Sequence, residues 1–182
     1  MSKPVSPPSP TAVRSPAKPR AKPRTTPGES ARAAGLFLDN QLCFSLYATS
    51  LAMTKVYRPL LAPLGLTYPQ YVVMLALWEH GELTAGGLGE RVALDSGTLV
   101  PLVRKLVSLG LLQRQRSASD DRSVLISLTS AGARMSQRAH GVHAQIACAT
   151  QCTEAELNVL MRSLQTLRAS LLIGAPPKAS AR

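Results

Sequence analysis

Cys43 stands in a segment whose residues could make a thiol reactive. The segment reads Leu-Asp-Asn-Gln-Leu-Cys-Phe over residues 38–44, and Asp39 is of a type that caps helix N-termini. A cap at Asp39 predicts that Cys43 closes the first helical turn, where unpaired backbone N–H groups and the helix dipole favour a thiolate. A thiolate reacts with peroxides to give a sulfenic acid, which condenses with a second thiol. The alternative is that Cys43 is a small buried hydrophobic residue, as most free cysteines are.

Cys148 and Cys152 could supply such a second thiol. Three cysteines without a signal peptide argue against a structural disulfide framework. His140 and His143 have a spacing at which two imidazoles could share a metal, but no carboxylate or cysteine lies at matching spacing nearby, so exposed helix histidines are favoured. The sequence shows no paired carboxylates, phosphate-binding loop or Ser/His/Asp order, and no cofactor or metal is expected.

The positive charge of the chain is concentrated at its ends. The 182 residues carry a formal net charge of +11, of which +6 falls in residues 1–34 and +2 in residues 174–182, so residues 35–173 hold only +3. The first segment is rich in Pro, Ser, Ala, Lys and Arg, a composition that predicts disorder. We expect one domain over residues 35–173 between two disordered tails, no membrane-spanning segment, and a cytoplasmic location. The basic tail could add DNA affinity or serve only solubility.

Apolar spacing and cap signals predict four helices in the first part of this domain. They cover about residues 38–61, 68–80, 83–92 and 95–109. Thr67 and Gln70 form a capping box that opens the second helix. Three glycines weaken the third helix. Asp95 opens the fourth and Gly110 closes it, and Pro101 inside this helix predicts a start nearer Thr98 or a bend.

The pattern then changes from helical to extended. Residues 111–116 and 123–128 predict two short strands, joined by a polar turn. Two short helices followed by such a hairpin form a winged helix-turn-helix, here about residues 66–128, so the fold class is mainly α with a small β-hairpin wing. Two closing helices are predicted at 129–148 and 153–172. Helices about 36–62 and 129–172 carry apolar faces too long to bury within one subunit, which predicts an isologous homodimer.

The fourth helix has the character of a DNA recognition helix. Opposite its stripe of Leu and Val, small polar residues precede two cations, an arrangement that suits the major groove of double-stranded DNA. The candidate contacts in this helix and in the wing are Ser96, Thr98, Arg104, Lys105, Arg116, Asp120 and Arg122. Arg122 would enter a narrow minor groove, oriented by Asp120. The alternative is a set of ordinary solvated charges, but a hairpin placed directly after the helix pair favours DNA binding.

These features resemble the MarR-type transcriptional regulators. The order of elements is similar, and the stretches 95–99, 119–122 and 128–132 look like that family's recognition-helix start, wing tip and post-wing turn. Three further stretches, 38–44, 57–61 and 65–71, are similar to the organic hydroperoxide resistance regulators of the two-cysteine kind. The match covers about residues 36–172. It departs from the family at residues 86–87, where two glycines replace bulkier helix formers.

The resemblance implies a redox-sensing repressor, not an enzyme, that binds operator DNA as a homodimer and releases it when organic hydroperoxides oxidise Cys43. In that family two tyrosines of the partner subunit donate hydrogen bonds to the reactive sulfur, and Tyr57 and Tyr68 match their positions. Cys148 matches the resolving cysteine, which meets the reactive one across the dimer interface, and Cys152 is a second candidate. Two rival functions stay open: a thiol peroxidase, and a MarR-type regulator of a small aromatic ligand.

Overall fold

The computed structural model describes residues 28, 35–116 and 124–174. The chain divides between Ser45 and Leu46 into two units, and each is described here by itself. The wing tip at residues 117–123 lies outside the described residues, and with it the predicted contacts Asp120 and Arg122. Most of the two predicted tails lies outside them as well.

The first unit contains a short 3-10 helix, η1 (Leu38–Asn40), and the beginning of α2 (Leu42–Leu61). The prediction that Asp39 caps the first long helix is wrong, because Asp39 lies inside η1 and Gln41 precedes α2. The backbone carbonyl of Gln41 accepts a hydrogen bond from the N–H of Ser45 at 3.1 Å. The Gln41 side-chain amide donates to the carbonyls of Gly35 and Phe37 at 3.1 and 3.3 Å. These bonds fold the preceding segment into a turn, so the helix begins later than the aspartate signal indicated.

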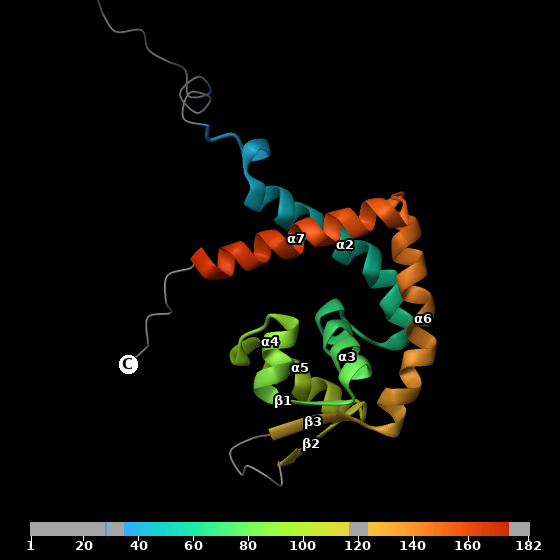
Figure 1. Ribbon diagram of the computed structural model, residues 1–182. Helices are drawn as coiled ribbons and strands as arrows, with labels where there is room; N and C mark the ends of the chain where they lie inside the picture. Colours follow the sequence, from blue (N-terminus) through green and yellow to red (C-terminus); the bar gives the residue numbers. More distant parts are fainter. Residues whose placement is uncertain (1–27, 29–34, 117–123, 175–182) are drawn as a thin grey trace, which may run out of the picture. The chain divides into compact units, whose positions relative to one another are not determined.

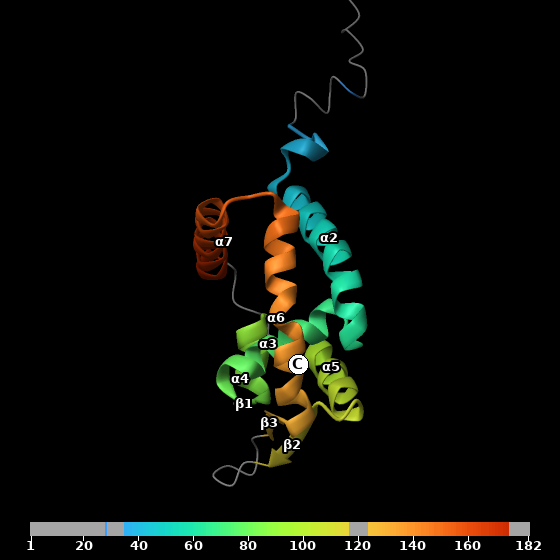
Figure 2. The ribbon, with the colours of Figure 1, turned by 90° about the vertical axis from the view of Figure 1, so that its right-hand side faces the viewer.

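The second unit is mostly helical, with a small antiparallel sheet (Figures 1 and 2). After α2 come η2 (Ala62–Leu64), α3 (Tyr68–His80), β1 (Glu82–Thr84), α4 (Ala85–Val92), α5 (Ser96–Ser108), β2 (Leu112–Arg116), β3 (Val124–Leu128), α6 (Ser130–Thr150) and α7 (Glu154–Gly174). The elements from α3 to β3 form a winged helix-turn-helix in which α5 is the second helix of the pair. The predicted fold class, mainly α with a small β wing, is confirmed.

Side-chain caps begin α3 and α5 at the predicted residues. The Gln70 side chain accepts a hydrogen bond from the Thr67 N–H at 2.9 Å, which completes the predicted capping box of α3. The Asp95 carboxylate accepts one from the Thr98 N–H at 2.9 Å and starts α5. The helix begins at Ser96 and contains Pro101, so the expected later start near Thr98 is wrong. The cap at Asp95 fixes the first turn ahead of the proline.

Gly110 ends α5 as predicted from the sequence. Its φ of 69° is left-handed, a conformation that glycine adopts without steric cost. The Leu111 N–H donates to the Leu106 carbonyl at 3.1 Å, and the Gly110 N–H donates to the Val107 carbonyl at 2.9 Å. This pair of bonds is the Schellman motif, which satisfies the last carbonyls of the helix and turns the chain into β2.

The sheet has three strands in the order β1-β3-β2, all antiparallel. The sequence predicted β2 and β3, within one residue of their ends, but it placed Leu83 and Thr84 in a helix. They belong instead to β1, in which Leu83 pairs with Ile126. A strand of three residues has too short a pattern to show a period of two, and its hydrogen-bonding partner β3 is distant in the sequence. Thr84 then caps α4, with its hydroxyl accepting from the Gly87 N–H at 3.0 Å.

The core of the second unit lies between α3, α4, α5 and the sheet, and α6 covers part of it. Its most buried side chains are Leu61, Val73, Met74, Leu77, Leu88, Leu106, Leu112 and Ile126. Ala139, Val142 and Ile146 of α6 join the same cluster. Among the described residues no single helix is long and apolar enough to cross a membrane; only the bent pair Leu42–Leu64 and Tyr68–His80 reaches that length and apolarity together.

Two helices keep apolar side chains exposed in the single chain. No residue of α7 is buried. Its exposed large hydrophobic residues are Val159, Leu160, Met161, Leu164, Leu171, Leu172 and Ile173, and those of α2 are Leu42, Leu46, Tyr47, Leu51 and Val56. The predicted closing helices thus exist, with bounds of Ser130–Thr150 and Glu154–Gly174, and their apolar faces are uncovered.

Candidate functional site

Cys43 is the second residue of α2, and its side chain is exposed in the single chain. The first N–H groups of a helix have no acceptor inside the helix and carry the positive end of its dipole. The thiol therefore lies in the first turn, as predicted, although Gln41 and not Asp39 precedes that turn. Within the single chain, Cys43 is not the buried hydrophobic residue of the alternative interpretation.

The second unit brings the two predicted tyrosines together. Tyr57 comes from α2 and Tyr68 is the first residue of α3, and their ring centroids lie 4.6 Å apart at an interplanar angle of 45°. A third phenol, Tyr71, packs against Tyr57 with a centroid distance of 5.9 Å. The sequence reasoning did not single out Tyr71. Its spacing of three from Tyr68 on one helix puts both on the same face and could have indicated it.

The environment of Tyr57 and Tyr71 keeps these two phenols protonated. Burial, and then the neighbouring phenols of Tyr68 and Tyr71, raises the pKa of Tyr57 from 10.0 to about 12. Burial also raises the pKa of Tyr71, with a smaller contribution from Tyr68. A phenol that keeps its proton is a hydrogen-bond donor across the whole range in which thiols titrate. The cluster can therefore donate to a thiolate and cannot compete with it for charge.

Trp78 continues the cluster toward α6. Its ring meets that of Tyr71 edge-on, with a centroid distance of 6.0 Å. Its indole N–H donates to the carbonyl of Gly132, in the first turn of α6, at 2.9 Å. Trp78 is also absent from the residues that the sequence singled out, yet its spacing of seven from Tyr71 places the two on one helix face.

The other two cysteines lie at the far end of α6. Cys148 belongs to its last turn and Cys152 follows the helix, and both are exposed. Gln151 between them is left-handed, with a φ of 55°. The Cys152 thiol donates to the carbonyl of Thr150 at 3.4 Å. Cys148 and the tyrosines belong to the second unit, whereas Cys43 belongs to the first.

The side chains of α5 and β2 that are predicted to contact DNA and lie within the described residues are all exposed. Ser96, Thr98, Arg104 and Lys105 are exposed, and so is Arg116 at the end of β2. The Thr98 hydroxyl donates to the Asp95 carboxylate at 3.0 Å, so the helix cap holds this side chain. The N–H and hydroxyl of Thr98 lower the pKa of Asp95, which keeps the cap ionised. Within the described part of the chain, Arg104 and Lys105 form no ion pair.

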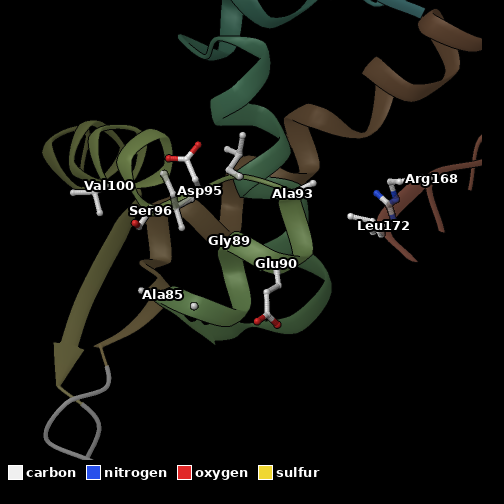
Figure 3. Close-up of a pocket in the computed structure, with 12 residues that line it drawn as sticks. Ala85, Gly89, Glu90, Ala93, Asp95, Ser96, Val100, Arg168 and Leu172 are labelled. Carbon is white, nitrogen blue, oxygen red and sulfur yellow. The ribbon is translucent and has the colours of Figure 1, made fainter. Parts of the chain in front are cut away.

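A hollow of about 660 Å³ lies beside the beginning of α5. Figure 3 shows its lining from α4, from the turn before α5, from α5 itself, and from Arg168 and Leu172 of α7. Most of the lining is small or apolar, with charged groups on Glu90, Asp95 and Arg168. The described residues contain no group of three His, Cys, Asp or Glu side chains that could hold a metal ion. His140 and His143 are exposed on α6.

Comparison with known proteins places this arrangement in a family. The family model described as transcriptional regulator SarA/Rot matches residues 55–138. An organic hydroperoxide resistance transcriptional regulator of Bacillus subtilis is 47% identical over 134 residues, which cover 74% of this chain and 91% of the relative. The structure of reduced AbfR bound to DNA is 31% identical, with a TM-score of 0.62, and the match covers 78% of this chain and 99% of that chain.

A structure of disulfide-formed AbfR is 33% identical, with a TM-score of 0.52, over 76% of this chain and 97% of that chain. The fold is shared with MarR from E. coli, and the chain belongs to the family of organic hydroperoxide resistance transcriptional regulators.

Proposed function

We propose that this chain is a homodimeric, redox-sensing repressor, which binds operator DNA while Cys43 is reduced and releases it when an organic hydroperoxide oxidises Cys43. The observation that carries the proposal is the exposed thiol in the first turn of α2, in a chain whose tyrosine pair, Tyr57 and Tyr68, is brought within 4.6 Å. The relative from Bacillus subtilis, named for organic hydroperoxide resistance, and the DNA-bound and disulfide forms of AbfR support it.

The proposed chemistry starts with attack by the Cys43 thiolate on the terminal oxygen of the hydroperoxide. The O–O bond breaks, the alkoxide leaves as an alcohol after protonation, and Cys43 becomes a sulfenic acid. The thiol of Cys148 in the partner subunit then attacks this sulfur, which forms a disulfide and releases water. Tyr57 and Tyr68 of the partner donate hydrogen bonds that stabilise the reduced thiolate, and oxidation removes their acceptor.

Release of DNA follows from the geometry of a dimer. Two recognition helices must keep a fixed spacing to occupy successive major grooves of one operator. A disulfide from the start of α2 to the end of the partner's α6 changes the positions of both helices and with them this spacing. The residues proposed to contact DNA are those of α5 and β2 described above, together with Asp120 and Arg122 of the wing.

Three serine variants test this function. Cys43→Ser is expected to bind operator DNA normally and to keep it when cumene hydroperoxide is added, because no sulfenic acid can form. Cys148→Ser should still respond through the sulfenic acid but give no covalent dimer on non-reducing gels. Cys152→Ser is the matched control, an exposed thiol outside α6, and should behave as wild type. Release of DNA by peroxide from Cys43→Ser would contradict the proposal.

The amount of hydroperoxide that each Cys43 consumes distinguishes a sensor from a peroxidase. The family is one of transcription regulators, and we propose that Cys43 reacts stoichiometrically rather than turning over hydroperoxide. A steady-state assay with a thiol reductant would then show consumption limited to the protein present, whereas sustained consumption would favour the enzyme.

One observation favours a second candidate function, which is binding of a small aromatic ligand. The hollow beside α5 has the size of a small-molecule site and borders Asp95 and Ser96, at the start of the recognition helix. Cys43→Ser isolates this possibility, since a phenolic ligand that releases DNA from this variant must act without the thiol.

A further inference from the structure

Four aromatic rings form a continuous column in the second unit, in the order Tyr68, Tyr57, Tyr71 and Trp78. Successive ring centroids lie 4.6, 5.9 and 6.0 Å apart. These distances are in the contact range of aromatic pairs, which favour tilted and edge-on geometries such as those seen here. The first two rings belong to the proposed sensor. Tyr71 and Trp78 have no part in the chemistry described so far.

The Trp78 end of the column is fixed to the body of the winged helix. The indole N–H of Trp78 donates to the Gly132 carbonyl at 2.9 Å, and the Gly132 N–H donates to the Thr129 hydroxyl at 3.0 Å. A β-carbon added at Gly132 would overlap the carbonyl oxygen of Leu111, so the backbones of α6 and of the turn before β2 are in direct contact there. Trp78 therefore has an anchored partner and little freedom to turn.

Tyr71 is the most buried ring of the column. Tyr57 and Tyr68 are partly exposed, whereas Tyr71 is only 4% exposed. The rings of Tyr57 and Tyr71 meet at 44°, and the Tyr71 ring meets Trp78 at 69° on its other side. A flat, buried ring between the hydrogen-bonded indole of Trp78 and the phenol of Tyr57 limits the side-chain rotations of that phenol. The Trp78 end is held by its hydrogen bond to Gly132, and the Tyr68 and Tyr57 end is the one proposed to act on the thiol.

We propose that Tyr71 is a positioning residue of the peroxide sensor, whose ring, held by Trp78, fixes Tyr57 in the orientation that donates a hydrogen bond to Cys43 of the partner subunit. This inference rests on the proposed function, in which the phenols stabilise the thiolate. Tyr71 itself touches neither the thiol nor the peroxide in this role, and its contribution comes from the ring rather than the hydroxyl.

The ring and hydroxyl contributions can be separated by substitution. Tyr71→Phe keeps the flat ring that contacts Tyr57 and Trp78, so the sensor should keep its reactivity. Tyr71→Leu fills part of the same space without a flat face, so Tyr57 gains rotational freedom. Val73→Ala is the matched control, because Val73 lies two residues further along α3, is 0% exposed, and is outside the column. It loosens the core packing of the same helix but leaves all four aromatic side chains in place.

The measurement uses the full-length dimer carrying Cys148→Ser and Cys152→Ser, so that Cys43 is the single thiol. Two rates are followed: alkylation by iodoacetamide from pH 5 to 9, and oxidation by cumene hydroperoxide at pH 7. Loss of one well-placed hydrogen bond to a charged group lowers reactivity by about tenfold. Tyr71→Leu should therefore react about tenfold more slowly at pH 7, with its alkylation profile displaced to higher pH. Tyr71→Phe should stay within about twofold of the parent in both rates.

Trp78→Phe provides a second route if Tyr71→Leu does not fold. It removes the N–H bond to Gly132 but keeps a ring, and should displace the alkylation profile in the same direction by a smaller amount. Parent-like rates and profiles in the folded Tyr71→Leu and in Trp78→Phe would overturn the positioning role. The same displacement in Val73→Ala would also overturn it, because general loosening of α3 would then suffice. A separate variant, Tyr57→Phe, tests the proposed function, since unchanged reactivity there would remove the hydrogen bond that Tyr71 is meant to position.

Discussion

A phenol can stabilise a thiolate only while it keeps its own proton. The pKa of Tyr57 rises to about 12, first through burial and then through two neighbouring phenols, so this side chain remains a donor wherever a thiol titrates. The raised pKa means that the folded state holds the proton more tightly than the unfolded chain. The associated stabilisation is complete below pH 10 and is lost as the pH rises toward 12. Nothing in this cluster therefore limits a thiol-based response at neutral pH.

Gly132 is a second residue whose type matters. Glycine is needed there because a side chain would have no room, and not because the backbone adopts a left-handed conformation. Its N–H, its carbonyl and its missing β-carbon all face close neighbours: the Thr129 hydroxyl, the Trp78 indole and the Leu111 carbonyl. A methyl group there must push the start of α6 away from the turn before β2. The nearest atoms belong to the backbone of Leu111, so no flexible side chain can move aside to make room for the methyl group. The hydrogen bonds of Gly132 further resist a shift of its backbone.

We predict that Gly132→Ala lowers the free energy of unfolding by about 1–3 kcal/mol or more, as overpacking of a close contact does. Gly86→Ala is the matched control, because nothing lies within 4 Å of a β-carbon built there and Gly86 is inside α4. Alanine in a helix interior should stabilise by roughly 0.5–1 kcal/mol relative to glycine. Urea unfolding of both variants measures these changes, and equal effects would show that the contact at Gly132 is readily relieved.

At the scale of elements, the parts of the fold predicted from sequence are those with local causes. The caps at Thr67 and Asp95 and the glycine at Gly110 act within a few residues of themselves, and each was correctly predicted. β1 was missed because its pairing with β3 is more than forty residues away in the chain. The start of α2 was misplaced because Gln41 forms bonds to backbone carbonyls that no capping pattern encodes.

The residues of the candidate site likewise fall into those that local sequence spacing could indicate and those that it could not. The tyrosine pair could be predicted only through resemblance to a family, since Tyr57 and Tyr68 lie on different helices and no spacing rule joins them. The helical spacing of Tyr68, Tyr71 and Trp78 was available in the sequence. What it could not show is that the ring of Tyr57 inserts beside them, which depends on the packing of α2 against α3.

The recognition helix gives a prediction at this scale. Arg104 is exposed on α5, on the face opposite the buried Leu99, Val103 and Leu106. Arg104→Ala should weaken operator binding by roughly 1–3 kcal/mol if the guanidinium contacts a base, and relax sequence preference at that position. Fluorescence anisotropy with operator DNA and with a scrambled duplex separates this effect from loss of charge.

Lys55→Ala is a suitable control for Arg104→Ala, because it removes the same charge from an exposed site on α2, outside the winged helix. Lys55→Ala should weaken binding to the operator and to the scrambled duplex slightly and equally, with a small change in the salt dependence of the binding constant. Arg122→Ala, in the wing, should weaken binding as Arg104→Ala does. Unchanged operator affinity in both arginine variants would contradict the proposed docking of the winged helix.

At the scale of the whole molecule, the apolar side chains of α7 need a partner. The helix has no buried residue, and Leu164 in the middle of its apolar stripe is 39% exposed in the single chain. The start of α7 is fixed by a cap, in which the Thr153 N–H donates to the Glu156 carboxylate at 2.7 Å. Along its length, however, the apolar side of the helix packs against no other part of the chain closely enough to be buried. A second copy of the chain is the partner that the proposed function requires.

Leu164→Glu is therefore expected to convert the dimer into a monomer that keeps its helical circular dichroism, because the substitution changes no contact of the winged-helix core. Thr166→Glu adds the same charge to the opposite side of α7, and should remain dimeric. Sedimentation equilibrium measures the association state. Since two linked recognition helices bind one operator far more tightly than two separate ones, the monomer should lose at least a hundredfold in operator affinity, on the order of the usual gain from bivalence. A dimeric Leu164→Glu would mean that α7 is covered by something other than a second copy, and that the two recognition helices are joined through another surface.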